Sequence, residues 1–97
     1  MSHKAITWAL QQTLADPGMK LVLIELANLA GSTNEAYPGA HYLAGRTAQD
    51  VTKVRADLAA LNEAGLIANR GPRMGRRGGC VWRLAVDGPV ENYVDPI

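Results

Sequence analysis

Residues 40–65 read AHYLAGRTAQDVTKVRADLAALNEAG, and this stretch holds two helical patterns only a few residues apart. The first, over residues 40–46, is long enough for two turns. The second covers residues 51–64, and its apolar positions recur at i, i+4 and i+7: Val54, Leu58 and Leu61. Asp50 is a typical N-cap for the second helix, and Gly65 is a typical residue to end it. The stretch therefore predicts a short helix, a tight turn and a longer amphipathic helix.

Two more helices are predicted on the N-terminal side. Asp16 followed by Pro17 is typical of a helix start, because aspartate caps the first turn and proline lacks only an N–H that this turn does not use. The helix from Pro17 to about Ala30 is apolar over most of its circumference, which predicts the central buried helix. Residues 4–12 predict a short first helix, and Gly31 is expected to end the central helix in the left-handed conformation.

The C-terminal side changes to a strand pattern. Residues 66–70 and 80–86 read as strands, and residues 71–79, rich in glycine and arginine, predict a long hairpin loop between them. The fold class expected from this order is α+β, mainly α: a winged helix-turn-helix with a two-stranded β-hairpin as the wing. We expect residues 1–86 to form this domain and residues 87–97 to be an irregular, acidic segment.

Length and composition exclude several classes of protein. A chain of 97 residues with 47% apolar and 20% charged residues suits one globular domain, so a multidomain enzyme is excluded. The most apolar stretch, residues 19–30, is too short and too polar to span a bilayer, and the N-terminus shows no apolar leader, so we expect a cytoplasmic protein. Cys80 has no second cysteine, and His3 and His41 are isolated. No metal, cofactor or enzymatic activity is expected.

The net charge of +1 conceals an uneven distribution. Residues 1–45 carry a net charge of −1, and residues 84–97 carry three acids and no base. Residues 46–83 carry eight bases and three acids, a net charge of +5. Positive charge gathered in one segment of a nearly neutral protein indicates a local anionic partner.

Several short motifs follow one another in a characteristic order: Ala5-Ile6-Thr7-Trp8-Ala9-Leu10, Lys20-Leu21-Val22-Leu23, Leu26-Ala27, Ala30, Tyr37-Pro38, Leu43-Ala44-Gly45-Arg46-Thr47, Gln49-Asp50, Val54, Leu58, Leu61 and Gly65-Leu66-Ile67. This series resembles the small helix-turn-helix domains of phage and prophage proteins, including the N-terminal domains of phage replication-initiation proteins. The resemblance covers about residues 5–67. The chain departs from it at Gly39, often serine in the family, at Ala48, often glycine, and at Val51, often basic. We expect Ala48 to fit a turn that needs no positive φ.

The resemblance implies that the helix of residues 51–64 lies in the major groove of DNA. The geometry of such a helix assigns Gln49, Thr52, Lys53 and Ala56 to the DNA face, with Lys53 and Thr52 as the first candidates. Arg55 points to the side and suits a phosphate as well as a base. Without the resemblance, an ordinary solvated helix face would explain the same residues equally well.

The predicted wing adds four arginines within eight residues: Arg70, Arg73, Arg76 and Arg77. Such a cationic loop suits phosphates or a narrow minor groove, and arginine binds phosphate through two parallel hydrogen bonds. A solvated loop that merely blunts the hairpin is the alternative.

We therefore expect sequence-specific binding of double-stranded DNA by a phage or prophage transcriptional regulator in the bacterial host cytoplasm, associated with the nucleoid. Recognition of a replication origin is an alternative within the same class. A protein-interaction module that contacts a phage or host protein is the rival from another class, and the modest net charge supports it. A small nuclease ranks third, because the acids of the basic segment are explained by helix capping and surface pairing. A homodimer on a palindromic site is also plausible.

Overall fold

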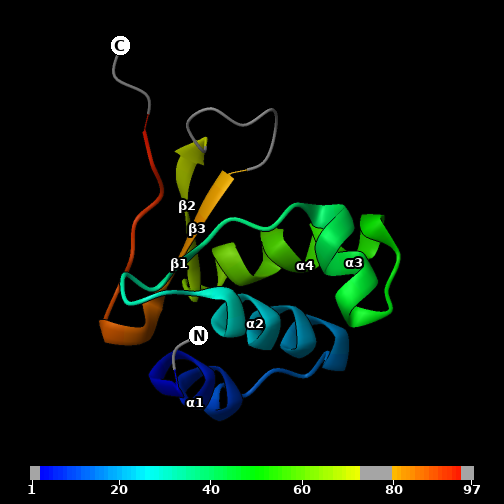
Figure 1. The fold of residues 1–97 in the computed structure, drawn as a ribbon, viewed down its shortest axis with the longest axis horizontal. Helices are drawn as coiled ribbons and strands as arrows, with labels where there is room; N and C mark the ends of the chain where they lie inside the picture. Colours follow the sequence, from blue (N-terminus) through cyan, green and yellow to red (C-terminus); the bar gives the residue numbers. More distant parts are fainter. Residues whose placement is uncertain (1–2, 73–79, 95–97) are drawn as a thin grey trace.

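The computed structural model describes residues 3–72 and 80–94, and all structural statements below concern these residues. Four helices and a small antiparallel sheet alternate along them (Figure 1). The bounds of the elements are α1 His3–Gln11, α2 Pro17–Leu29, β1 Glu35–Ala36, α3 Ala40–Thr47, α4 Val51–Glu63, β2 Ile67–Pro72, β3 Cys80–Leu84 and a 3₁₀ turn, η1, Ala85–Asp87. The fold is mainly helical α+β, as expected for a winged helix-turn-helix.

The predicted start of α2 is confirmed. The Asp16 carboxylate accepts hydrogen bonds from the backbone N–H groups of Gly18, at 2.9 Å, and Met19, at 3.4 Å, and Pro17 occupies the first turn. These contacts satisfy two of the N–H groups that a helix start leaves without partners.

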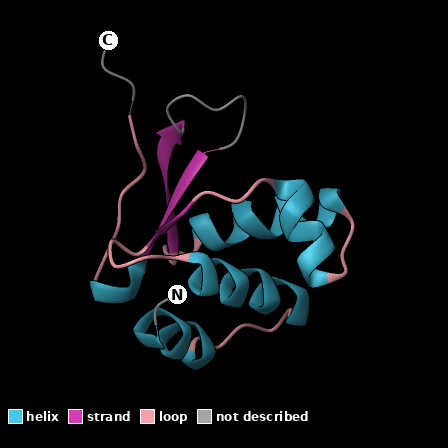
Figure 2. Ribbon diagram, in the orientation of Figure 1, coloured by secondary structure: helices cyan, strands magenta, loops and turns pink. Residues whose placement is uncertain are grey.

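Helix α2 is the centre of the core, as its apolar circumference predicts. It packs against α1 on one side and against α3 and α4 on the other, so the other three helices are arranged around it (Figure 1). Its inward side chains are fully buried: Val22, Leu23, Leu26 and Ala27. The sheet stands at one end of this helical layer (Figure 2).

The expected two-stranded hairpin is present as the antiparallel pair β2 and β3, and a third strand, β1, extends the sheet. Strand β3 lies in the middle, in the order β1-β3-β2, and Glu35 pairs with Arg83 across the β1–β3 ladder. No strand was expected at β1, Glu35–Ala36. A strand of two residues carries no alternation that a sequence could reveal, and its pairing with β3 arises only when the chain has folded.

The backbone conformations of Gly31, after α2, and Ala48, after α3, both differ from those expected. Gly31 does not adopt positive φ; instead α2 ends at Ala30 in the extended conformation, and the left-handed residue of that loop is Asn34, with φ 62°. Ala48 was expected to fit a turn without positive φ, yet it has φ 56° and ψ 41°. Gly65 does take the predicted left-handed conformation after α4, with φ 79°.

Within the described residues, the helices are too short and too polar for any of them to cross a membrane.

Candidate nucleic-acid interface

Helices α3 and α4 form a helix-turn-helix, joined by residues 48–50. The left-handed Ala48 reverses the chain after α3, and Asp50 then caps α4 by accepting a hydrogen bond from the Thr52 N–H at 2.9 Å. The Thr47 hydroxyl is buried and donates to the Leu43 carbonyl at 2.7 Å, which closes the end of α3. The turn is therefore held by local hydrogen bonds on both sides.

Helix α4 has a buried face and an open face. The predicted apolar stripe packs inward against α2, and Val54 and Leu61 are fully buried. The open face carries mostly small side chains: Thr52, Arg55, Ala56, Ala59 and Ala60. Among the described residues, Arg55 has no acidic partner. Three of the expected DNA-facing residues, Thr52, Arg55 and Ala56, therefore lie on one accessible surface.

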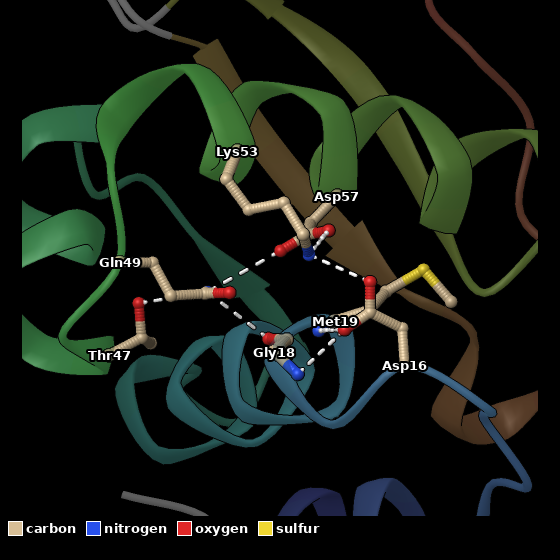
Figure 3. Close-up of polar contacts among 7 residues, drawn as sticks. All are labelled: Asp16, Gly18, Met19, Thr47, Gln49, Lys53 and Asp57. Carbon is tan, nitrogen blue, oxygen red and sulfur yellow. Dashed lines mark hydrogen bonds and ion pairs between the residues drawn. The ribbon is translucent and has the colours of Figure 1, made fainter.

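Lys53 does not lie on that open face, although it was a first candidate for DNA contact. Its ammonium group is held between two carboxylates, Asp16 Oδ2 at 2.7 Å and Asp57 Oδ1 at 2.6 Å (Figure 3). Asp16 belongs to the start of α2, so this pair of contacts ties α4 to the central helix. The hydrogen bonds to Asp16 and Asp57 raise the pKa of Lys53, and the hydrogen bond from Lys53 lowers the pKa of Asp16.

Gln49 is also turned inward, contrary to its expected place on the DNA face. Its amide nitrogen contacts the Gly18 carbonyl at 3.3 Å, the Thr47 hydroxyl at 3.2 Å and Asp57 Oδ2 at 3.4 Å (Figure 3). A Cβ on Gly18 would lie only 1.9 Å from Gln49 Oε1. Glycine at this position therefore allows the turn of the helix-turn-helix to reach the backbone of α2.

The two acids that contact Lys53, Asp16 and Asp57, were not among the expected residues of the interface. Asp57 was attributed to surface pairing, which is wrong, because the residue is only 3% exposed. A sequence signal was present: Asp57 lies three residues after Val54 and four before Leu61, so it falls on the apolar stripe. A carboxylate on a buried stripe needs a cationic partner, and Lys53, four residues earlier, is placed to provide one.

The wing is described only at its base. Arg70, on β2, is exposed, and its guanidinium donates to the Glu91 carbonyl at 2.6 Å. Arg83, on β3, lies 3.8 Å from Glu35. The other three arginines of the predicted wing fall outside the described residues: Arg73, Arg76 and Arg77.

Comparison with known families shows that residues 17–67 match a family described as a helix-turn-helix domain. The matched region runs from the start of α2 to the start of β2, and so contains α2, α3, the turn and α4. Searches of curated proteins and of solved structures found no match. A helix-turn-helix domain indicates DNA as the partner, in agreement with the open face of α4. Since the match covers more than half of the chain and the geometry agrees with it, the chain belongs to this family of helix-turn-helix domains.

Proposed function

We propose that this protein binds double-stranded DNA sequence-specifically, with α4 in the major groove, as a transcriptional regulator of a phage or prophage. The observation that carries the proposal is the open face of α4, which the left-handed turn at Ala48 presents beside α3. In this proposal the protein binds DNA and does not catalyse a reaction, and it associates with the bacterial nucleoid.

The side chains on the open face suggest what α4 can read. Ala56 and the methyl group of Thr52 suit the methyl group of thymine, because an apolar contact distinguishes thymine from the other bases. Arg55 is long enough to reach a phosphate or the O6 and N7 atoms of guanine. Small residues on the remainder of this face allow the helix backbone to approach the groove closely.

Gln49 and Lys53 take a supporting role in this proposal. Because Lys53 bridges Asp16 and Asp57, it determines how α4 is oriented on α2, and Gln49 fixes the turn to the same helix. We assign both residues to positioning α4 and not to contacting bases. The wing arginines, Arg70 with Arg73, Arg76 and Arg77, are assigned to phosphates by their charge.

Fluorescence anisotropy with random-sequence duplex DNA at about 50 mM and about 200 mM salt tests the proposal, since each lost phosphate contact makes the slope of log K against log salt less negative by about 0.9. We expect Arg55→Ala and the triple variant Arg73→Ala/Arg76→Ala/Arg77→Ala to bind more weakly. Lys20→Ala is the matched control, because it removes one cation whose ammonium group donates to the carbonyls of Leu10 and Gln12, at the end of α1. Site selection then follows, with Thr52→Ala expected to relax specificity by about 1–3 kcal/mol per base pair read.

A second candidate function is a protein-interaction module, which the near-neutral charge favours. Three cations on the described helices are already paired with acids: Lys4 with Asp87, Lys53 with Asp16 and Asp57, and Arg46 with Glu25 at 3.2 Å. Absence of DNA binding by the wild type at low salt would favour this second function. A homodimer would be detected by light scattering with and without a palindromic duplex.

A further inference from the structure

Residues 88–94, which form no helix or strand, lie along the outer edge of β2 (Figure 1, orange to red). Because the sheet has the order β1-β3-β2, this edge of β2 is not paired with another strand. Three hydrogen bonds hold the segment there: the Tyr93 N–H donates to the Asn69 carbonyl at 2.6 Å, the Asn69 N–H to Asn92 Oδ1 at 2.9 Å, and Arg70 Nη1 to the Glu91 carbonyl at 2.6 Å. The segment therefore covers the strand that leads into the basic loop.

The contacts bring an acid against the basic part of the chain. Residues 88–94 contain one acid, Glu91, and no base, whereas residues 46–83 carry a net charge of +5. Through its carbonyl, Glu91 occupies the guanidinium of Arg70, and its own carboxylate adds negative charge beside the wing. Negative charge at this place repels phosphates and weakens the attraction of the wing for DNA.

The segment is anchored firmly at one end and lightly along the rest. Asp87, at the end of η1, accepts hydrogen bonds from Asn34, at 2.9 Å, and from Lys4. Gly88 follows with φ 131°, a conformation that glycine adopts easily and other residues do not. Beyond this point burial is slight, since Val94 is 81% exposed. Segments with few buried contacts open at low free-energy cost, and Gly88 is a natural hinge for such opening.

We propose that residues 88–94 are a strap that weakens DNA binding by holding Arg70 on the edge of β2, and that DNA displaces the strap. This inference rests on the proposed DNA-binding function. A phosphate is a stronger partner for a guanidinium than a carbonyl oxygen is, because it is charged and can accept two parallel hydrogen bonds. Release of the strap therefore frees the Arg70 guanidinium for a DNA phosphate.

The test compares the wild type with Asn92→Ala/Tyr93→Pro by anisotropy on the same duplex over a range of salt concentrations. This double variant loses the acceptor for the Asn69 N–H and the donor to the Asn69 carbonyl, and its net charge is unchanged. We expect binding about three- to tenfold tighter at low salt and a salt slope steeper by about 0.9, the contribution of one further phosphate contact.

Two controls separate detachment from a general effect of mutation. Val94→Ala changes the most exposed side chain of the strap and should leave the affinity unchanged. In an Arg70→Ala background, detaching the strap should alter the affinity by less than about twofold, because the competing residue is gone. Circular dichroism checks folding, and Asn92→Ala alone replaces the double variant if the latter does not fold.

The possible results have distinct meanings. Tighter binding that depends on Arg70 supports the strap. Equal affinities of the wild type and the folded detached variant overturn the strap and leave the proposed function intact. If neither protein binds duplex DNA at low salt, the proposed function fails, and the strap fails with it.

Discussion

The left-handed Ala48 leads to an unusual expectation: replacing it with glycine should stabilise the protein. Alanine at φ 56° and ψ 41° brings its Cβ close to the following carbonyl oxygen, which costs about 1–2 kcal/mol. Glycine removes this cost but gives the unfolded chain more freedom, which costs about 0.4–1 kcal/mol. Ala48 is exposed, so little packing is lost with its methyl group. The net expectation is an increase of about 0.5–1 kcal/mol in the free energy of unfolding.

Ala59→Gly is the matched control, because it makes the same chemical change at an exposed position inside α4. There the backbone is right-handed, and glycine should destabilise the protein by about 0.8–1.0 kcal/mol. Thermal unfolding followed by circular dichroism can resolve the difference, since 1 kcal/mol shifts the Tm of a domain of this size by about 4–8 °C.

The expected result is a pair of opposite shifts: a higher Tm for Ala48→Gly and a lower one for Ala59→Gly. The effect on the unfolded chain is the same in both variants, so the sign of the difference depends on the folded backbone. A drop in Tm for Ala48→Gly equal to that of the control would refute the left-handed turn between α3 and α4.

Three other predictions concern the buried core and the polar contacts of Gln49 and Lys53 with the start of α2 (Figure 3). Leu26→Ala should lower the free energy of unfolding by about 2–5 kcal/mol in urea titration, because Leu26 is fully buried on α2; a loss near zero would contradict its place in the core. Gly18→Ala should displace the end of the Gln49 side chain, and the loss of its contacts offsets the helix propensity gained with alanine; in a Gln49→Ala background the same change should stabilise the protein, and fully additive effects would count against the close approach. Lys53→Met should have a lower free energy of unfolding than the wild type at neutral pH. This difference in free energy should become smaller at both low and high pH. The lowered pKa of Asp16 gives a contribution that is present above the unfolded value of about 3.9 and lost as pH falls through the folded pKa. The raised pKa of Lys53 gives a second contribution to stability, which is present below pH about 10.4 and lost as pH rises through the folded pKa. If the difference in unfolding free energy between Lys53→Met and the wild type stayed the same from pH 2 to 11, that result would contradict the ion pairs.

The candidate interface was only partly predictable. The geometry of a recognition helix assigned Gln49, Thr52, Lys53 and Ala56 together to the DNA face, with Arg55 to the side. Thr52, Ala56 and Arg55 are exposed, whereas Gln49 and Lys53 contact α2 and the residue that caps it. These two contacts join Gln49 to the Gly18 carbonyl and Lys53 to Asp16, which are distant in the sequence and come close only when α2 and α4 pack together.

The amino-acid sequence by itself determined the helices and the N-terminal caps of α2 and α4. Asp16 and Asp50 cap these helices through contacts with residues two or three positions away, and the stripe of α4 follows from the period of the helix, so these features need no distant partner. Tertiary structure alone decided the pairing of Glu35–Ala36 with β3, the contact of Lys53 with Asp16 and the docking of residues 88–94 on β2. Each of these features joins segments far apart in the chain, and their contacts exist only once the core has brought those segments together.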